Sequence, residues 1–149
     1  MSVGASFPRS TLRIAVLLVL AAGAAFTVAG ADTNSARYKF EGNRWLALDL
    51  AVGDVRAETI RFEWPATLMR VKTGYKATVK IANGSSTQAR VGIAVALIDK
   101  DVKLIGAGTT GTTLGTIDPG DTGQFTIDFK DVTARLEQAD QFLIALETR

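Results

Sequence analysis

Side chains that could carry out acid–base or nucleophilic chemistry are few in this chain of 149 residues. It has no His and no Cys, which excludes the Ser-His and Cys-His pairs of covalent catalysis. Two carboxylates can hydrolyse a glycoside without either residue type, and Glu58 and Glu63 are candidates for such a pair. Because they are expected on one strand at an odd separation, they lie on opposite faces unless a bulge resets the alternation. We therefore predict no catalytic residues and no enzyme activity; a hydrolase would need both acids in one cleft.

Asp99 and Asp101 have the D-x-D spacing with which carboxylates can bind a hard cation. Calcium requires roughly six to eight oxygen ligands that converge on one point, and the next acidic turn, at Asp118 and Asp121, is expected at the other end of the fold. Formation of a turn is the simpler role for these aspartates. We predict no metal site, and binding of a cation by Asp99 and Asp101 stays open.

Gly106, Gly108 and Gly111 fit the pattern G-x-G-x-x-G of a dinucleotide-binding loop. In such a loop a helix must follow, because its N-terminal amides bind the pyrophosphate. Here Thr112–Thr116 contains poor helix formers and leads into a Pro-Gly turn. We therefore predict no cofactor and interpret the glycines as a flexible or bulged edge segment.

Aromatic side chains are the remaining candidates for contact with a ligand. Trp64 and Tyr75 are in phase with apolar neighbours, so we expect them in the core. For Tyr38 and Trp45 the sequence pattern does not clearly indicate burial in the core. If both are exposed on one surface, they could stack against a sugar, and we predict Tyr38 and Trp45 as candidate ligand contacts.

The elements that must position these residues are predicted to be strands. Tyr75–Ile81 alternates between apolar and polar residues, as a half-buried strand does. Asn83–Ser86 then forms a turn in which Asn and Gly adopt positive φ at low cost, and this turn explains the N-x-S sequon there without a glycan. Ala89–Ile98 is apolar on both faces, so we expect a central strand whose second side is covered.

Further strands are predicted where short apolar alternations are bounded by turn residues. They cover Tyr38–Phe40, Trp45–Leu50, Val55–Trp64, Lys103–Ala107, Gln124–Phe129 and Gln141–Leu146. The inward parity changes between Ala57 and Ile60, which predicts a bulge near Glu58. Val132–Ala139 has helical spacing. Seven to eight short strands with frequent turns predict an all-β, antiparallel β-sandwich.

Four short motifs follow one another in the second half of the chain. They are N-G-S-S at Asn83–Ser86, V-A-L-I-D at Val95–Asp99, L-I-G at Leu104–Gly106 and D-P-G-D at Asp118–Asp121. In this order they resemble a family of bacterial immunoglobulin-like domains of the FxLYD type, which occur in exported proteins. In that family an N-x-S turn precedes a strand that ends in F/V-x-L-Y/F-D, and a Pro-Gly turn precedes the next strand.

The positions that match this family pattern are Leu97, Asp99, Pro119 and Gly120. Val95 and Ile98 replace the usual Phe and Tyr, and Val102 stands where the hairpin Gly is expected. The resemblance covers about Tyr75–Leu146. It implies a seven-stranded immunoglobulin-like sandwich in an exported protein, and it implies no catalytic residue.

The N-terminal segment has the three parts of a secretory signal. Two arginines precede the unbroken apolar run Ile14–Ala22, and Ala29-Gly30-Ala31 has the form of an A-x-A cleavage site. We predict an N-terminal signal helix within residues 1–31 and one domain over residues 32–149. Retention of Ile14–Ala31 as a membrane anchor is the alternative, although Gly and Thr dilute its second half.

Charge and Cys content also bear on function. All fifteen acidic residues follow position 31 whereas Arg9 and Arg13 precede it, so residues 32–149 are formally neutral. This sequence therefore lacks the basic excess that is typical of nucleic-acid binding. An exported domain without Cys cannot use disulfides, so its core must hold it together.

The sequence thus predicts a non-enzymatic, exported immunoglobulin-like domain, located in the periplasm or outside the cell. We expect it to act on a protein partner, by edge-strand pairing or as a spacer in an envelope assembly. No nucleic-acid partner is expected, and membrane contact is expected only through residues 1–31 if they are retained. A small carbohydrate- or ligand-binding module that uses Tyr38 and Trp45 is the alternative.

Overall fold

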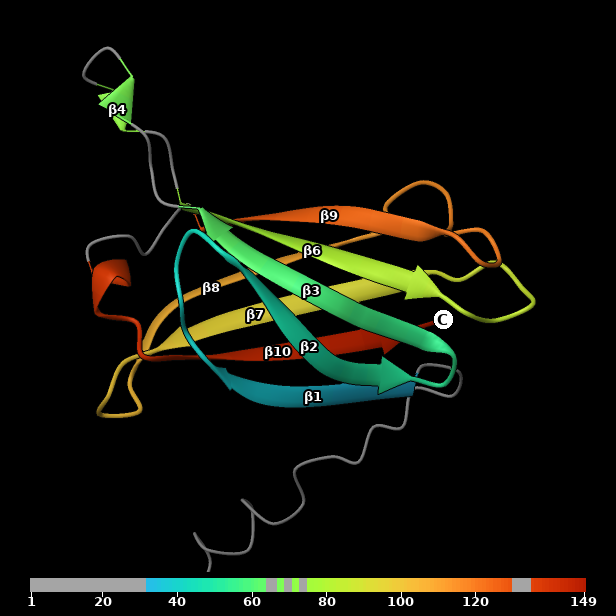
Figure 1. Cartoon of the computed structure of the whole chain (residues 1–149), viewed down its shortest axis with the longest axis horizontal. Helices are drawn as coiled ribbons and strands as arrows, with labels where there is room; N and C mark the ends of the chain where they lie inside the picture. The colour runs from blue at the N-terminus through green and yellow to red at the C-terminus, as the bar shows by residue number, and fades with distance from the viewer. Residues whose placement is uncertain (1–31, 64–66, 69–70, 73–74, 130–134) are drawn as a thin grey trace, which may run out of the picture.

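The computed structural model describes residues 32–63, 67–68, 71–72, 75–129 and 135–149 (Figure 1). The predicted signal segment, Trp64 and the predicted helix up to residue 134 lie outside these residues. The strands are β1 (Asp32–Lys39), β2 (Trp45–Val52), β3 (Val55–Glu63), β4 (Thr67–Leu68), β5 (Val71–Lys72), β6 (Tyr75–Asn83), β7 (Val91–Ile98), β8 (Leu104–Gly111), β9 (Thr122–Phe129) and β10 (Gln141–Thr148). A 3₁₀ helix, η1 (Leu136–Gln138), precedes β10.

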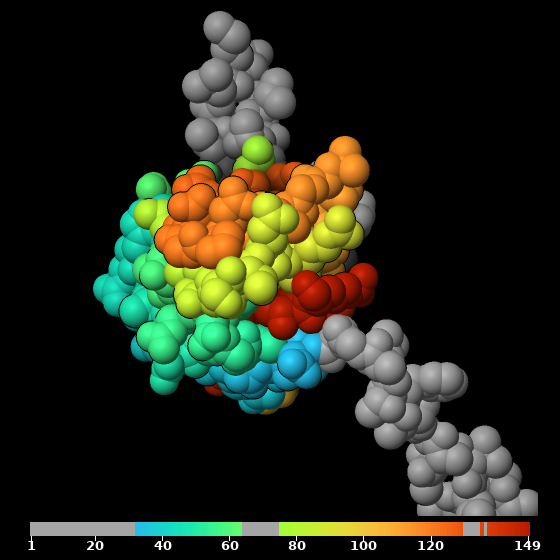
Figure 2. All heavy atoms as spheres, turned by 90° about the vertical axis from the view of Figure 1, so that its right-hand side faces the viewer, coloured from blue at the N-terminus to red at the C-terminus, as the bar shows by residue number. Residues whose placement is uncertain are grey.

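The eight long strands form two antiparallel sheets that pack face to face. One sheet has the order β1-β10-β7-β8 and the other has the order β2-β3-β6-β9, and Figure 1 shows them as two layers. The short strands β4 and β5 pair with each other. Figure 2 shows the end of the sandwich at which β1 begins, in blue, beside the end of β10, in red. The prediction of an antiparallel β-sandwich with seven to eight strands is confirmed.

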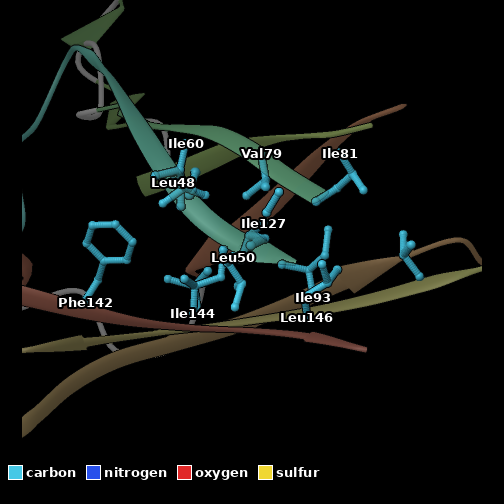
Figure 3. Close-up of a cluster of buried hydrophobic side chains, with 14 of the residues drawn as sticks. Leu48, Leu50, Ile60, Val79, Ile81, Ile93, Ile127, Phe142, Ile144 and Leu146 are labelled. Carbon is cyan, nitrogen blue, oxygen red and sulfur yellow. The ribbon is translucent and has the colours of Figure 1, made fainter. Parts of the chain in front are cut away.

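Alternate residues from both sheets face inward and form the core. On β6 the buried positions include Ala77, Val79 and Ile81, as the alternation of this segment predicts. Figure 3 shows Val79 and Ile81 from one sheet, and Phe142 and Ile144 from the other, directed into the space between the sheets. Burial of each large apolar side chain is worth roughly 1.5–3 kcal/mol, so these inward rows are the main source of stability.

A bulge lies in β3 at the position that the change of parity predicts. The pairing of β3 with β6 shifts register between Ala57 and Thr59, which leaves Glu58 as the extra residue. Residues at an odd separation on a regular strand face opposite sides, yet Ala57 and Ile60 are both buried. The bulge therefore lets both ends of β3 contribute to the core.

The second side of β7 is only partly covered. The strand is central in its sheet, as predicted, between β10 and β8, and its inward residues are buried. On the other side Ile98 is buried and Gly92 and Ala96 are half-buried, whereas Ala94 is exposed. Because Gly and Ala carry little apolar area, this face can remain in water at a small cost.

Two further elements differ in extent from their predictions. β1 runs from Asp32 to Lys39 because it pairs with β10 along its whole length. The described end of the helix predicted over Val132–Ala139 is helical, but as the short 3₁₀ helix η1, which ends at Gln138. The backbone of Asp140 donates to Ile98 O at 2.9 Å and accepts from the N–H of Phe40 at 2.8 Å. These two bonds hold the chain in an extended form before β10.

Contacts between the sheets close the sandwich along both edges. Between β1 and β2, Asn34 Nδ2 donates to Ala51 O at 2.9 Å, and the N–H of Asp49 donates to the Tyr38 hydroxyl at 2.8 Å. Between β8 and β9, the backbone at Gly108 lies directly against Ile127. The backbone of the outer strands is therefore already engaged with the opposite sheet at these points.

The turn between β7 and β8 contains a strained residue. Val102 has φ of 62°, a region that a β-branched residue rarely enters, and its side chain is 62% exposed. Because the side chain packs against little, the strain is not offset by burial. This is the position at which the family pattern has Gly.

We predict that Val102→Gly raises the free energy of unfolding by about 1 kcal/mol, because Gly adopts positive φ without steric cost. Urea denaturation at constant slope measures the change. Val102→Ala keeps the Cβ and is the matched control, with a smaller gain. A loss of stability in the glycine variant would contradict the assignment of strain to this residue.

Candidate functional site

Tyr38, one of the two predicted ligand contacts, is directed into the sandwich. Its ring stacks on Phe142 with the centroids 5.4 Å apart. Phe142 in turn packs edge-on against Phe62 at 4.9 Å. The Tyr38 hydroxyl accepts the hydrogen bond from Asp49 N–H that links the two sheets. These contacts give Tyr38 a structural role.

Trp45, the other predicted contact, lies on the outer face of the β2-β3-β6-β9 sheet and is 42% exposed. The Lys80 Nζ is 4.8 Å from the centroid of its ring. Since Tyr38 faces inward and Trp45 outward, the structure does not bring the two rings together on one surface. Trp45 and the outward residues around it, Thr59, Arg61, Lys80, Gln124 and Thr126, are called the tryptophan face below.

Two polar atoms of the tryptophan face are covered and lack hydrogen-bond partners among the described residues. They are Thr59 Oγ1 and Arg61 Nε. Arg61 Nε lies 3.8 Å from Glu63 Oε1, which is an ion pair beyond hydrogen-bond distance. Polar atoms left without a partner in this way are uncommon in folded proteins and require an explanation.

The outer face of the other sheet is nearly free of charge at its centre. Cross-strand neighbours there are Leu143, Ala96 and Ala107 in one row, and Ala145, Ala94 and Thr109 in the next. We call these six residues the alanine face. A shallow depression of about 260 Å³ opens where its small side chains meet Gly92 and Glu147.

Charged side chains border the alanine face on one side. Arg37 and Lys39 of β1 are exposed and stand opposite Leu143 and Gln141 of β10. Neither cation makes an ion pair with any residue that the structure describes. At the β8 side of the sheet, Leu104 is 65% exposed. The face is thus apolar at the centre and positive along the β1 border.

Glu58 and Glu63 are both exposed on β3. At about 3.3 Å per residue, five residues of strand separate them by roughly 16 Å. Two-carboxylate glycosidases hold their carboxyl groups no more than about 10 Å apart, so this backbone spacing does not favour a glycosidase pair. No cluster of three or more His, Cys, Asp or Glu that could hold a metal ion occurs among the described residues.

Asp99 is 3% exposed and both of its carboxylate oxygens are engaged. Oδ1 accepts from the N–H groups of Asp101 and Lys103, each at 2.9 Å, and Oδ2 accepts from Arg135 Nη2 at 2.6 Å. The Lys103 N–H is the largest cause of a lowered pKa of Asp99, and the Asp101 N–H and Arg135 lower this pKa further. The arrangement supports the interpretation of Asp99 as the residue that forms the β7–β8 turn.

Asn83 also has a structural role. It is buried, and its Nδ2 donates to Thr87 O at 2.8 Å and to Ile117 O at 2.9 Å. Its Oδ1 accepts from the Ser85 hydroxyl at 2.7 Å. The side chain therefore organises the predicted turn after β6, although neither Asn83 nor Gly84 has the positive φ that the prediction assumed.

The G-x-G-x-x-G segment forms the bulged edge strand β8, whose register with β7 shifts next to Leu97. A loop leads from β8 to β9, and no helix occurs between them. A Cβ at Gly108 would lie 2.5 Å from Cγ2 of Ile127 and 3.1 Å from the carbonyl oxygen of Asp128. Close approach of the two sheets explains this glycine without a nucleotide.

Comparison with protein-family models and with curated proteins finds no match to this chain. The resemblance to FxLYD-type domains therefore remains a prediction beyond the sandwich fold itself. Among the residues that the structure describes, no helix is long and apolar enough to cross a membrane.

Sequence reasoning missed both the alanine face and the residues around Trp45. The alternation Gly92, Ala94, Ala96 along β7 is visible in the sequence, but its neighbours depend on pairing with β8 and β10. The approach of Lys80 to Trp45 depends in the same way on β2, β3 and β6 being adjacent. Strand order, which the sequence does not reveal directly, is the missing information.

We predict that Gly108→Ala lowers the free energy of unfolding by about 2 kcal/mol, because the added methyl group overpacks the contact between β8 and β9. Gly92→Ala is the matched control. A Cβ at Gly92 would meet Glu147 Cβ at an ordinary 3.7 Å, so this variant keeps or slightly gains stability. Chemical denaturation compares the two, and equal losses would contradict the proposed close approach.

A pH dependence follows from the lowered pKa of Asp99. A carboxyl whose pKa is lower in the folded state stabilises the fold above its unfolded pKa of about 3.9, and this contribution is lost as the pH falls through the folded value. Asp99→Asn should therefore be less stable than the wild type at pH 7. The difference should shrink as both are acidified below pH of about 4, measured by urea midpoints. A difference that is the same at neutral and acidic pH would contradict the role of the charge.

Proposed function

We propose that this protein is a non-enzymatic, exported β-sandwich module that acts by contact with another protein. The observation that carries the proposal is the alanine face, whose six central residues bear no charge and leave an open, flat surface on a sheet. Depletion of charge at the centre, with polar residues at the rim, is the composition of protein interfaces.

The partner that fits this face is a protein with an apolar strip and carboxylates along one side. Arg37 and Lys39 border the alanine face and make no ion pair with a described residue. Carboxylates of a partner would pair with these cations and orient it across the sheet. Such charges at the rim contribute more to specificity and to the association rate than to affinity.

The size of the face indicates a transient contact. The whole outer face of this sheet, four strands of eight residues, extends over about 500 Å² at ordinary strand spacings, and the alanine face is its central part. A stable interface buries about 800 Å² on each partner. A contact confined to this face is therefore expected to be weak, and the proposal names a different protein as its transient partner.

Pairing at a strand edge is less well supported than contact through the face. The β1–β2 edge is engaged by the bonds from Asn34 and from Asp49, and β8 lies against β9 at Gly108. A partner strand would have to displace these contacts, whereas the alanine face is open.

Export is supported by the charge and hydropathy pattern of residues 1–31. The chain has no Cys, so an oxidising compartment would not alter it through disulfide formation.

The immunoglobulin-like topology has less support. Immunoglobulin sheets have the strand orders ABED and CFG, whereas here β2, β3 and β6, consecutive among the eight long strands, are neighbours in one sheet. The proposal therefore depends on the sandwich and its faces, and not on membership of that family.

Photo-crosslinking in the source cell tests the proposal. A photoreactive phenylalanine analogue at the position of Ala94 is expected to give one discrete protein adduct, because this position is at the centre of the face. The same analogue at Ala47, which is exposed on the outer face of the other sheet, is the matched control and is expected to give no such adduct. Equal adducts at both positions, or none at Ala94, would overturn the proposal.

Reversing the charges of Arg37 and Lys39 in the same crosslinking experiment tests whether these cations orient the partner. Arg37→Glu combined with Lys39→Glu should reduce the Ala94 adduct at least fivefold, because the partner is expected to present carboxylates. Arg56→Glu combined with Lys76→Glu makes the same charge change on the other sheet and should leave the adduct unchanged. Equal reduction by both pairs would mean that net charge, and not the border of the alanine face, controls the contact.

A further inference from the structure

The tryptophan face has the geometry of a second, separate binding site. Trp45 is on β2 and Lys80 is on β6, with β3 between them. Neighbouring strands lie about 4.8 Å apart, so the indole and the Lys80 side chain, with 4.8 Å between Nζ and the ring centroid, together span β3. The indole remains 42% exposed.

Cationic groups without strong partners lie close to this ring. Lys80 makes no ion pair with a described residue. Arg61, directly opposite Trp45 in the register, has a side chain that is 39% exposed and an ion pair of 3.8 Å with Glu63. Its Nε has no hydrogen-bond partner among the described residues. Of the two lysines on this face, Lys76 forms an ion pair of 3.8 Å with Asp128, whereas Lys80 forms none with a described residue.

Neutral polar groups continue the tryptophan face on the far side of β6. Gln124 stands opposite Lys80, and Thr126 stands opposite Thr78, in the pairing of β6 with β9. Gln124 and Thr126 are exposed, so their amide and hydroxyl groups are available as donors and acceptors. A ligand on this face would meet an apolar ring, two cations and neutral hydrogen-bonding groups within one sheet.

These groups favour an acidic sugar over a nucleic acid. One face of a pyranose ring is lined with C–H groups and can stack on an indole, while its hydroxyls need hydrogen-bonding partners around the ring. A single carboxylate on that sugar would meet Lys80 or Arg61. A polyphosphate chain would also pass Glu58, Glu63 and Asp128, which are exposed on the same sheet, and the formally neutral residues 32–149 provide no basic stripe for it.

We propose that Trp45, Lys80 and Arg61 form a binding site for an acidic saccharide, in which a pyranose ring stacks on the indole and its carboxylate pairs with the two cations. The site is on the opposite sheet from the alanine face, so the two proposals stand or fall separately.

Isothermal titration of residues 32–149 with an oligogalacturonate tests this site, and a neutral malto-oligosaccharide of the same length is the comparison ligand. The acidic ligand is expected to bind at least tenfold more tightly than the neutral one. Trp45→Ala should weaken binding at least tenfold, and Lys80→Gln at least fivefold. Circular dichroism and the thermal midpoint confirm that each variant is folded.

Lys76→Gln is the matched control, because it removes one positive charge from the same face at a residue already paired with Asp128. It should leave the affinity within twofold of the wild type. Equal effects of Lys76→Gln and Lys80→Gln would overturn the proposal, since they would show non-specific attraction of an anion. The proposal would equally be overturned by equal affinity for the neutral sugar, by tighter binding of a single-stranded oligonucleotide, or by no binding of the oligogalacturonate at millimolar concentration.

Discussion

The contact between the inner faces of the two sheets is the interaction on which the rest of the structure depends. With no Cys in the chain, no disulfide can join the sheets, and the sandwich must be stable through packing of its inward rows. Phe129, Phe142, Ile60 and Leu50 are among the large side chains that are fully buried there. Any substitution that separates the sheets is therefore expected to affect the whole domain, because no covalent link between the sheets compensates for lost packing.

Close packing between the two sheets limits which surfaces of the domain can bind other molecules. The sheets approach closely enough at Gly108 that no side chain fits between β8 and β9, and Tyr38 links β1 to β2 through its hydroxyl. With both edges engaged, the surfaces left for recognition are the two outer faces and the turns. These faces differ in chemistry: one has small apolar residues with cations along a border, and the other has mixed charges around a single exposed Trp. We infer that they serve different ligands.

Local pattern was sufficient to predict much of the fold and little of the surface. The strict alternation of Tyr75–Ile81 and the change of parity near Glu58 predicted β6 and the bulge in β3, because both depend on side-chain direction along one strand. The covered second side expected for β7 was only partly right: Ile98 is buried and Gly92 and Ala96 are half-buried, but Ala94 is exposed. Of the helix predicted over Val132–Ala139, the described end is the 3₁₀ helix η1, and the next residues lead into β10 through the backbone bonds of Asp140. The surroundings of Trp45 required knowledge of strand order, which no single segment contains.

The central claim is that a partner protein covers the alanine face in the cell, and the absence of native Cys permits a direct measurement. Ala94→Cys introduces a single thiol at the centre of that face, and Arg56→Cys introduces one on the other sheet, away from the tryptophan face. Both should react with a maleimide at similar rates in the purified protein, since both positions are exposed. In intact source cells, we expect the thiol at position 94 to be protected severalfold relative to that at position 56. Equal labelling of the two positions in cells would contradict the claim.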